Sequence, residues 1–209
     1  MCDTPSPARR NRPAASGVNP ATPHAGFTAA QPAGGGSTPQ GSPRLIGWPR
    51  QLSWSDFTDI QRRPEGESED ATIAMQMRPG ALSFLQEGGQ HRLGDVAFNM
   101  VLNSSATWVV ASAKSADLLH HEQGHYDIVG LCYRDMVNEI RALRERSRNR
   151  LVRAVRRVMR AQDQRADSLT RTYDSAQQTN HGRNSARQQV WSRQIEGCRR
   201  SGARLSVPE

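Results

Sequence analysis

The fold of this protein is decided by one stretch, LLHHEQGHYDI at residues 118–128. It contains an HExxH motif, with His121 and His125 four positions apart. In a helix, residues i and i+4 lie one turn apart on the same face, so these two imidazoles can share a metal ion. Zinc suits imidazole, and a catalytic zinc site has three protein ligands and an open position for water. The motif therefore predicts a metal-binding helix that supplies two of three ligands to one zinc ion.

Glu122, next to His121, is the predicted general base. Its carboxylate can take a proton from zinc-bound water as the water attacks a carbonyl group, and can then deliver that proton to the leaving amine. This chemistry predicts a zinc-dependent metallohydrolase. We expect an endopeptidase with a protein or peptide substrate.

The sequence on both sides of the motif predicts an α+β fold. Residues 71–110 alternate between apolar and polar positions and are rich in β-branched and aromatic residues, which predicts a small mixed sheet. Ser115 is a good N-cap for a helix that carries the motif. A break at residues 147–149 separates it from a second, arginine-rich helix, so we expect a long helical hairpin.

The third zinc ligand must come from the returning arm of this hairpin. Along a continuous helix, acidic residues beyond His125 move away from the metal by 1.5 Å per residue. An antiparallel return brings the chain level with the motif near residues 171–174. Of the groups there, we predict His181 as the ligand, because histidine is the commonest metal ligand, and Asp174 is the alternative. Tyr173 is a candidate donor to the developing oxyanion, and a buried aromatic is the role that we favour for it.

The 209 residues are interpreted as one domain with two tails. Residues 1–43 are rich in Pro, Gly and Ser and have a single aromatic, so we expect a disordered leader. A zincin-like domain is expected over 44–200 and a flexible C-terminal tail over 201–209. No apolar run is long enough to span a membrane, and the N-terminus has no hydrophobic core of a signal peptide.

Arginine dominates the charge of the chain, and this suggests a second hypothesis. The 28 basic and 20 acidic residues give a net charge of +8. An arginine-rich hairpin could bind nucleic acid or another acidic polymer, in which case the protein would be a catalytically silent binding module. We favour the hydrolase, because GC-rich codon usage also produces arginine-rich surfaces. A disulfide between Cys132 and Cys198 and the oligomeric state are left open by the sequence.

Several segments together resemble a known family. They are LSWSDF at 52–57, Trp108, LLHHEQGHYDI at 118–128, and the residues Tyr173, Asp174, Thr179, His181, Gly182, Gln188 and Trp191. In these segments the chain resembles the bacterial predicted secreted zinc-dependent proteases, a domain of unknown function grouped with the HExxH zincin peptidases. The resemblance implies a zincin-like fold, one zinc ion, peptidase activity and an extracellular or periplasmic location. It puts His121, Glu122, His125 and His181 at motif positions.

Overall fold

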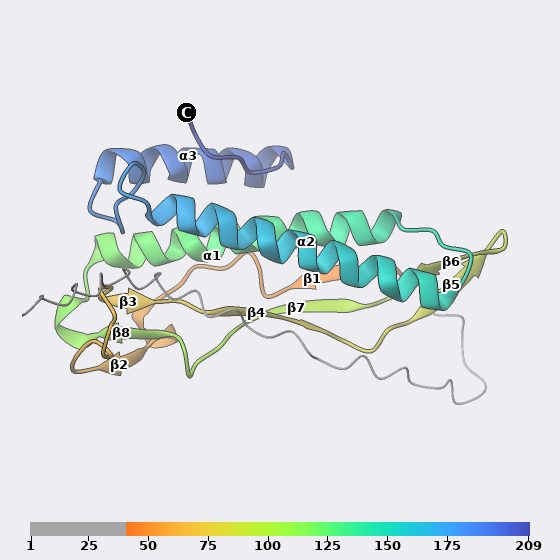
Figure 1. The fold of residues 1–209 in the computed structure, drawn as a ribbon, viewed down its shortest axis with the longest axis horizontal. Coiled ribbons are helices and arrows are strands. Elements are labelled where there is room, and N and C mark those ends of the chain that lie inside the picture. The colour runs from red at the N-terminus through yellow and green to blue at the C-terminus, as the bar shows by residue number, and fades with distance from the viewer. Residues whose placement is uncertain (1–40) are drawn as a thin grey trace, which may run out of the picture.

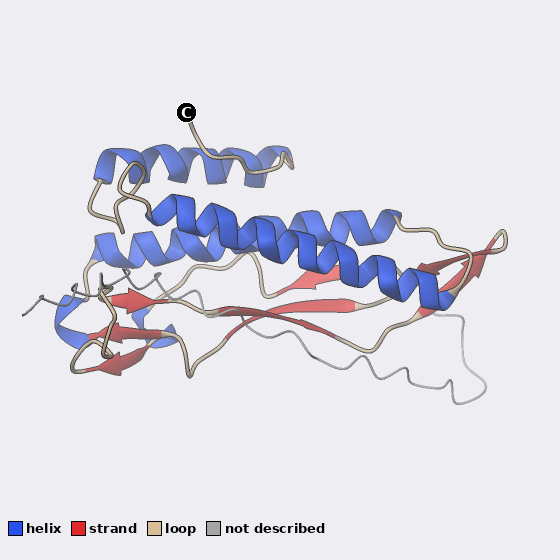
Figure 2. Cartoon of the chain, viewed as in Figure 1, coloured by secondary structure: helices blue, strands red, loops and turns tan. Residues whose placement is uncertain are grey.

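The structure is a computed structural model of the chain and describes residues 41–209. It is a mixed α+β fold in which three helices lie on one side of small β-sheets (Figure 1). The helices are α1 (Ala116–Ala142), α2 (Arg148–Asp174) and α3 (Ser185–Ser201). Figure 2 shows the strands confined to the part of the chain before α1. The predicted α+β class is confirmed, and the predicted 1–43 leader falls almost entirely outside the described residues.

The strands form two mixed three-stranded sheets and one hairpin. The first sheet has the order β1-β7-β4 and the second has the order β2-β8-β3, each with one parallel and one antiparallel pair. Strands β5 and β6 pair as an antiparallel hairpin. The strand bounds are β1 Arg44–Ile46, β2 Thr58–Ile60, β3 Ala71–Thr72, β4 Met75–Pro79, β5 Phe84–Glu87, β6 Gln90–Leu93, β7 Ala97–Leu102 and β8 Trp108–Val110. The single sheet predicted over residues 71–110 is thus divided among three sheets, and two of these also include strands from before residue 71.

The two long helices begin where the sequence predicts. The Ser115 side chain accepts a hydrogen bond from the backbone amide of Leu118, and Ser147 accepts one from the amide of Arg150. Each serine satisfies a helix N–H group that has no partner inside the helix. Helix α1 contacts α2 and α3 on one side and strands of both three-stranded sheets on the other. The motif helix is therefore the central element of the fold.

Gly124 allows α2 to approach α1 closely. A Cβ atom at Gly124 would lie 2.0 Å from Tyr173 Oη. Tyr173 is fully buried and its ring contacts those of His121 and Trp191, so it has no room to withdraw. The glycine in the middle of the motif is therefore required by packing.

Replacing Gly124 with alanine should destabilise the fold. We expect Gly124→Ala to lower the free energy of unfolding by about 1–3 kcal/mol, the usual cost of overpacking a core. The matched control is Gly197→Ala on α3, where a Cβ would meet no atom within 4 Å. There alanine should raise stability by up to about 1 kcal/mol. Urea unfolding of both variants measures the difference, and equal effects would contradict this account.

The C-terminal segment, for which the sequence predicts a flexible tail over 201–209, packs against the domain. After α3 the chain turns and runs back along that helix (Figure 1). Leu205 is only 3% exposed, and its carbonyl oxygen accepts a hydrogen bond from Arg165 at 2.6 Å. Arg187 donates to the carbonyl oxygen of Pro208. The segment is ordered because its apolar residue enters the core and arginines satisfy its backbone carbonyl groups.

Two further sequence questions are answered by the described residues. Cys132 and Cys198 are both buried free thiols, so no disulfide joins them. Within residues 41–209, no helix combines the length and the apolar composition that a membrane span requires.

Candidate metal centre

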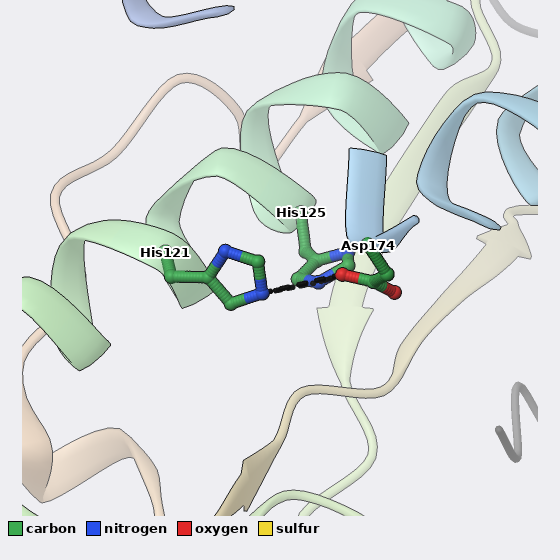
Figure 3. Close-up of side chains that lie close together, drawn as sticks. All are labelled: His121, His125 and Asp174. Carbon is green, nitrogen blue, oxygen red and sulfur yellow. Dashed lines mark hydrogen bonds and ion pairs between the residues drawn. The ribbon is translucent and has the colours of Figure 1, made fainter. Parts of the chain in front are cut away.

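Three side chains converge where the start of α1 meets the end of α2 (Figure 3). His121 and His125 come from successive turns of α1, and Asp174 is the last residue of α2. Asp174 Oδ1 lies 3.2 Å from His121 Nε2 and 2.8 Å from His125 Nε2. The two Nε2 atoms are 3.2 Å apart. We call these three residues the His-His-Asp cluster.

The spacing of these atoms fits a small divalent cation. Tetrahedral zinc, with nitrogen and carboxylate ligands at 2.0–2.2 Å, places its ligand atoms about 3.3 Å from one another. The observed separations of 2.8 to 3.2 Å are close to that value. Asp174 Oδ1 is also buried, and both imidazoles form ion pairs with it. All three atoms are thus directed at one point, where a single cation could contact each of them.

Gln188 on α3 holds His121 in a definite orientation. Its Oε1 atom lies 3.2 Å from His121 Nδ1, and its Nε2 donates to Tyr173 Oη. Because the amide nitrogen is used on Tyr173, Oε1 is left to accept the Nδ1 proton of His121. The His121 Nε2 lone pair then faces the cluster, as metal binding requires. The sequence analysis assigned no role to Gln188, which lies 67 positions beyond His121.

Tyr173 packs against His121 and holds its ring in place. Its ring stacks on His121, with ring centroids 4.8 Å apart and planes 7° from parallel. Its hydroxyl donates to the carbonyl oxygen of His121 at 3.2 Å and accepts from Gln188. The hydroxyl is thus engaged in fixed contacts in the interior. These contacts are those of a buried aromatic, the role favoured for Tyr173 from the sequence.

His181 lies outside the cluster, and the sequence-based prediction differs from the structure here. Its Nδ1 atom lies 3.0 Å from Glu69 Oε1. The reason is the tight turn after α2, in which Asn180 and His181 both have positive φ angles and His181 N donates back to the carbonyl of Asp174. The turn presses Gly182 against His121, where a Cβ would come within 3.1 Å of the His121 side chain. Asp174, the alternative candidate, occupies the third position.

Glu122 is buried beside the cluster, with only 3% of its surface exposed. Burial raises the pKa of Glu122 to about 7. The positive charge of His125 opposes this rise, and the carboxylates of Asp174 and Glu69 add to it. A carboxylate with a raised pKa is a stronger base than one in water. Glu69 was not singled out in the sequence, because only the fold brings its loop to this helix.

The pKa values of the three side chains in the His-His-Asp cluster are strongly shifted. Burial disfavours the charged form of His125, but the neighbouring Asp174 carboxylate outweighs it and raises the pKa of His125 to about 9. Burial likewise disfavours ionised Asp174, yet His125 and His121 hold its pKa well below the usual range. For His121, burial dominates and the pKa is lowered. Buried groups with perturbed pKa values and a specific charge partner are typical of functional sites.

Comparison with known proteins finds a match over part of the chain. Residues 103–182 match a family described as bacterial protein of unknown function (DUF922). The matched segment contains α1, α2 and the turn through Gly182, and thus the whole His-His-Asp cluster and Glu122. No curated protein and no solved structure matches the chain. The family description assigns no activity, so any functional argument must come from the geometry of the site.

Proposed function

We propose that this protein is a zinc-dependent hydrolase, with His121, His125 and Asp174 as the metal ligands. The observation that carries the proposal is the convergence of two Nε2 atoms on a buried Asp174 oxygen, at separations close to those between ligand atoms around zinc. Two nitrogen donors and one carboxylate form a donor set found in catalytic zinc sites. A three-residue set leaves a coordination position free for water, which distinguishes a catalytic from a closed structural site.

The chain's own residues would have distinct roles. Zinc, when bound, would polarise a substrate carbonyl and make water a better nucleophile. Glu122 would accept the proton of the attacking water and pass it to the leaving group. Its burial makes it a stronger base than a carboxylate in water. Gln188 would keep the His121 ring in the tautomer and orientation that ligation needs. Tyr173 would hold His121 in place by stacking.

We further propose that the bond cleaved is a peptide bond and that the chain is a zincin-like peptidase. The support is the HExxH spacing on a helix, together with a buried glutamate next to the first histidine.

The test combines metal analysis with an unbiased digest. The purified full chain, reconstituted with zinc and dialysed, should contain close to one equivalent of zinc. It should cleave members of a mixed peptide library, detected by mass spectrometry, and cleavage should stop with a chelator and return when zinc is added. Protein that stays metal-free after reconstitution would overturn the zinc site. Zinc-loaded protein that cleaves no peptide would overturn the peptidase assignment and leave the metal site intact.

A further inference from the structure

Helix α2 carries a straight row of exposed arginines in its N-terminal half. They are Arg150, Arg153, Arg157 and Arg160, and all four are exposed. Their spacing of three, four and three residues places them on one face of a helix with 3.6 residues per turn. The opposite face, with Leu151 among its residues, is buried in the core. We call these four residues the arginine stripe.

The stripe lacks the opposite charges that normally accompany arginine on a helix surface. Across residues 41–209, no carboxylate lies within ion-pair distance of any of its four guanidinium groups. Residues 148–162 contain six arginines and no aspartate or glutamate. Neighbours in the stripe are therefore like charges at i,i+3 and i,i+4, an arrangement that destabilises a helix. A helix selected only for stability and solubility would mix the two signs.

The position of the stripe near the N-terminus of α2 is also unfavourable for the stability of the helix. The N-terminal end of a helix carries a partial positive charge and favours acidic side chains. The first turn of α2 has no acidic residue, and Arg150 lies within it. Residues that break local stability rules without a compensating contact are expected at functional surfaces. A bound polyanion would offset the repulsion among these arginines and with the positive end of the helix.

The stripe is separate from the metal centre. Asp174 lies at the other end of α2, 14 residues beyond Arg160, which is about 21 Å along the helix axis. Helix α3 runs beside the C-terminal half of α2 only, so it leaves the stripe uncovered (Figure 1). The stripe and the metal centre are therefore two distinct sites on the same helix.

The chemistry of the stripe fits phosphate groups. A guanidinium group binds phosphate through two parallel hydrogen bonds. From Arg150 to Arg160 the stripe covers about 15 Å, and one strand of duplex DNA presents about four phosphates over that length. Large exposed apolar side chains in residues 41–209 are limited to Ile46 and Val207. Within this range, no fully exposed aromatic side chain is therefore available to stack on single-stranded bases, and no fully exposed large apolar side chain lies beside the stripe to enter a bilayer.

We propose that the arginine stripe binds the phosphate backbone of duplex DNA without sequence preference. Phosphate contacts alone supply nearly all of non-specific DNA binding, so a purely electrostatic surface is sufficient. The stripe thus gives the chain a polyanion-binding surface in addition to the metal centre.

The experiment measures binding of the full chain to a random-sequence 30-base-pair duplex by fluorescence anisotropy between 50 and 200 mM salt. With four phosphates neutralised, the slope of log affinity against log salt should be about −3.6, or about a 150-fold loss over this range. Replacing all four stripe arginines with glutamine should weaken binding at 50 mM salt at least tenfold and bring the slope near zero. The matched control, with glutamine at Arg62, Arg78, Arg193 and Arg200, removes the same charge from other exposed positions. It should keep the slope within about one unit of wild type.

Other outcomes would overturn the proposal. An equal loss in the control variant would mean that net charge, not the stripe, binds the duplex. A wild-type slope near zero would mean that phosphates are not contacted. Stronger binding to anionic phospholipid vesicles than to the duplex at the same salt would assign the stripe to a lipid surface instead. Circular dichroism of the stripe variant should show unchanged helix content, since glutamine is as good a helix former as arginine.

Discussion

Zinc should be lost when Asp174 is replaced with alanine and retained when His181 is replaced with alanine. In the cluster, the Asp174 oxygen lies within 3.2 Å of both imidazole nitrogens, whereas His181 pairs with Glu69. Removing an outer-shell partner typically weakens metal binding by about 10–100-fold, and loss of a ligand should cost more. We therefore expect zinc affinity to fall by more than about 100-fold in Asp174→Ala and by less than about tenfold in His181→Ala.

Competition with a chromophoric zinc chelator measures both affinities. Gln188→Ala provides a graded control, because Gln188 contacts the His121 ring without belonging to the cluster. Zinc affinity in this variant should fall by about 10–100-fold, between the other two. Thermal melting of the metal-free variants shows whether each chain is folded. If His181→Ala loses zinc and Asp174→Ala keeps it, the ligand set proposed from the structure is wrong and the sequence-based choice is correct.

Glu122→Gln should abolish hydrolysis while keeping both the zinc and the fold. Glutamine preserves the shape of the side chain, but its amide does not accept a proton from water. General-base catalysis contributes about 10²–10⁴-fold, so the turnover number should fall by that factor. Loss of a buried carboxylate whose pKa is raised by burial should not destabilise the protein.

The measurement uses whichever library peptide the wild-type protein cleaves, with zinc content determined on the same samples. Glu196→Gln on α3 is the matched control, because this glutamate is half-exposed and pairs with Arg199 and Arg200 on its own helix. It should leave turnover unchanged. A Glu122→Gln variant that turns over at the wild-type rate would show that another group is the base.

The parts of the fold that the sequence predicts are those set by local interactions. The caps at Ser115 and Ser147 and the apolar spacing of α1 act within a few residues, so the two long helices begin where expected. The strands before residue 71 escaped prediction because β1 and β2 have three residues each and pair with β7 and β8, far along the chain. A strand of three residues carries too little periodicity to be recognised alone.

The same division applies to the metal centre. By itself, the sequence determined that His121, Glu122 and His125 share one end of a helix, because i,i+4 geometry follows from the helical repeat. Only the tertiary structure decided the third member. That choice depends on where α2 ends, on the turn that directs His181 to Glu69, and on α3, which brings Gln188 to His121. These contacts join residues about 50 to 110 positions apart. Which residues meet is set by packing of the whole core, and no local sequence pattern reports on that packing.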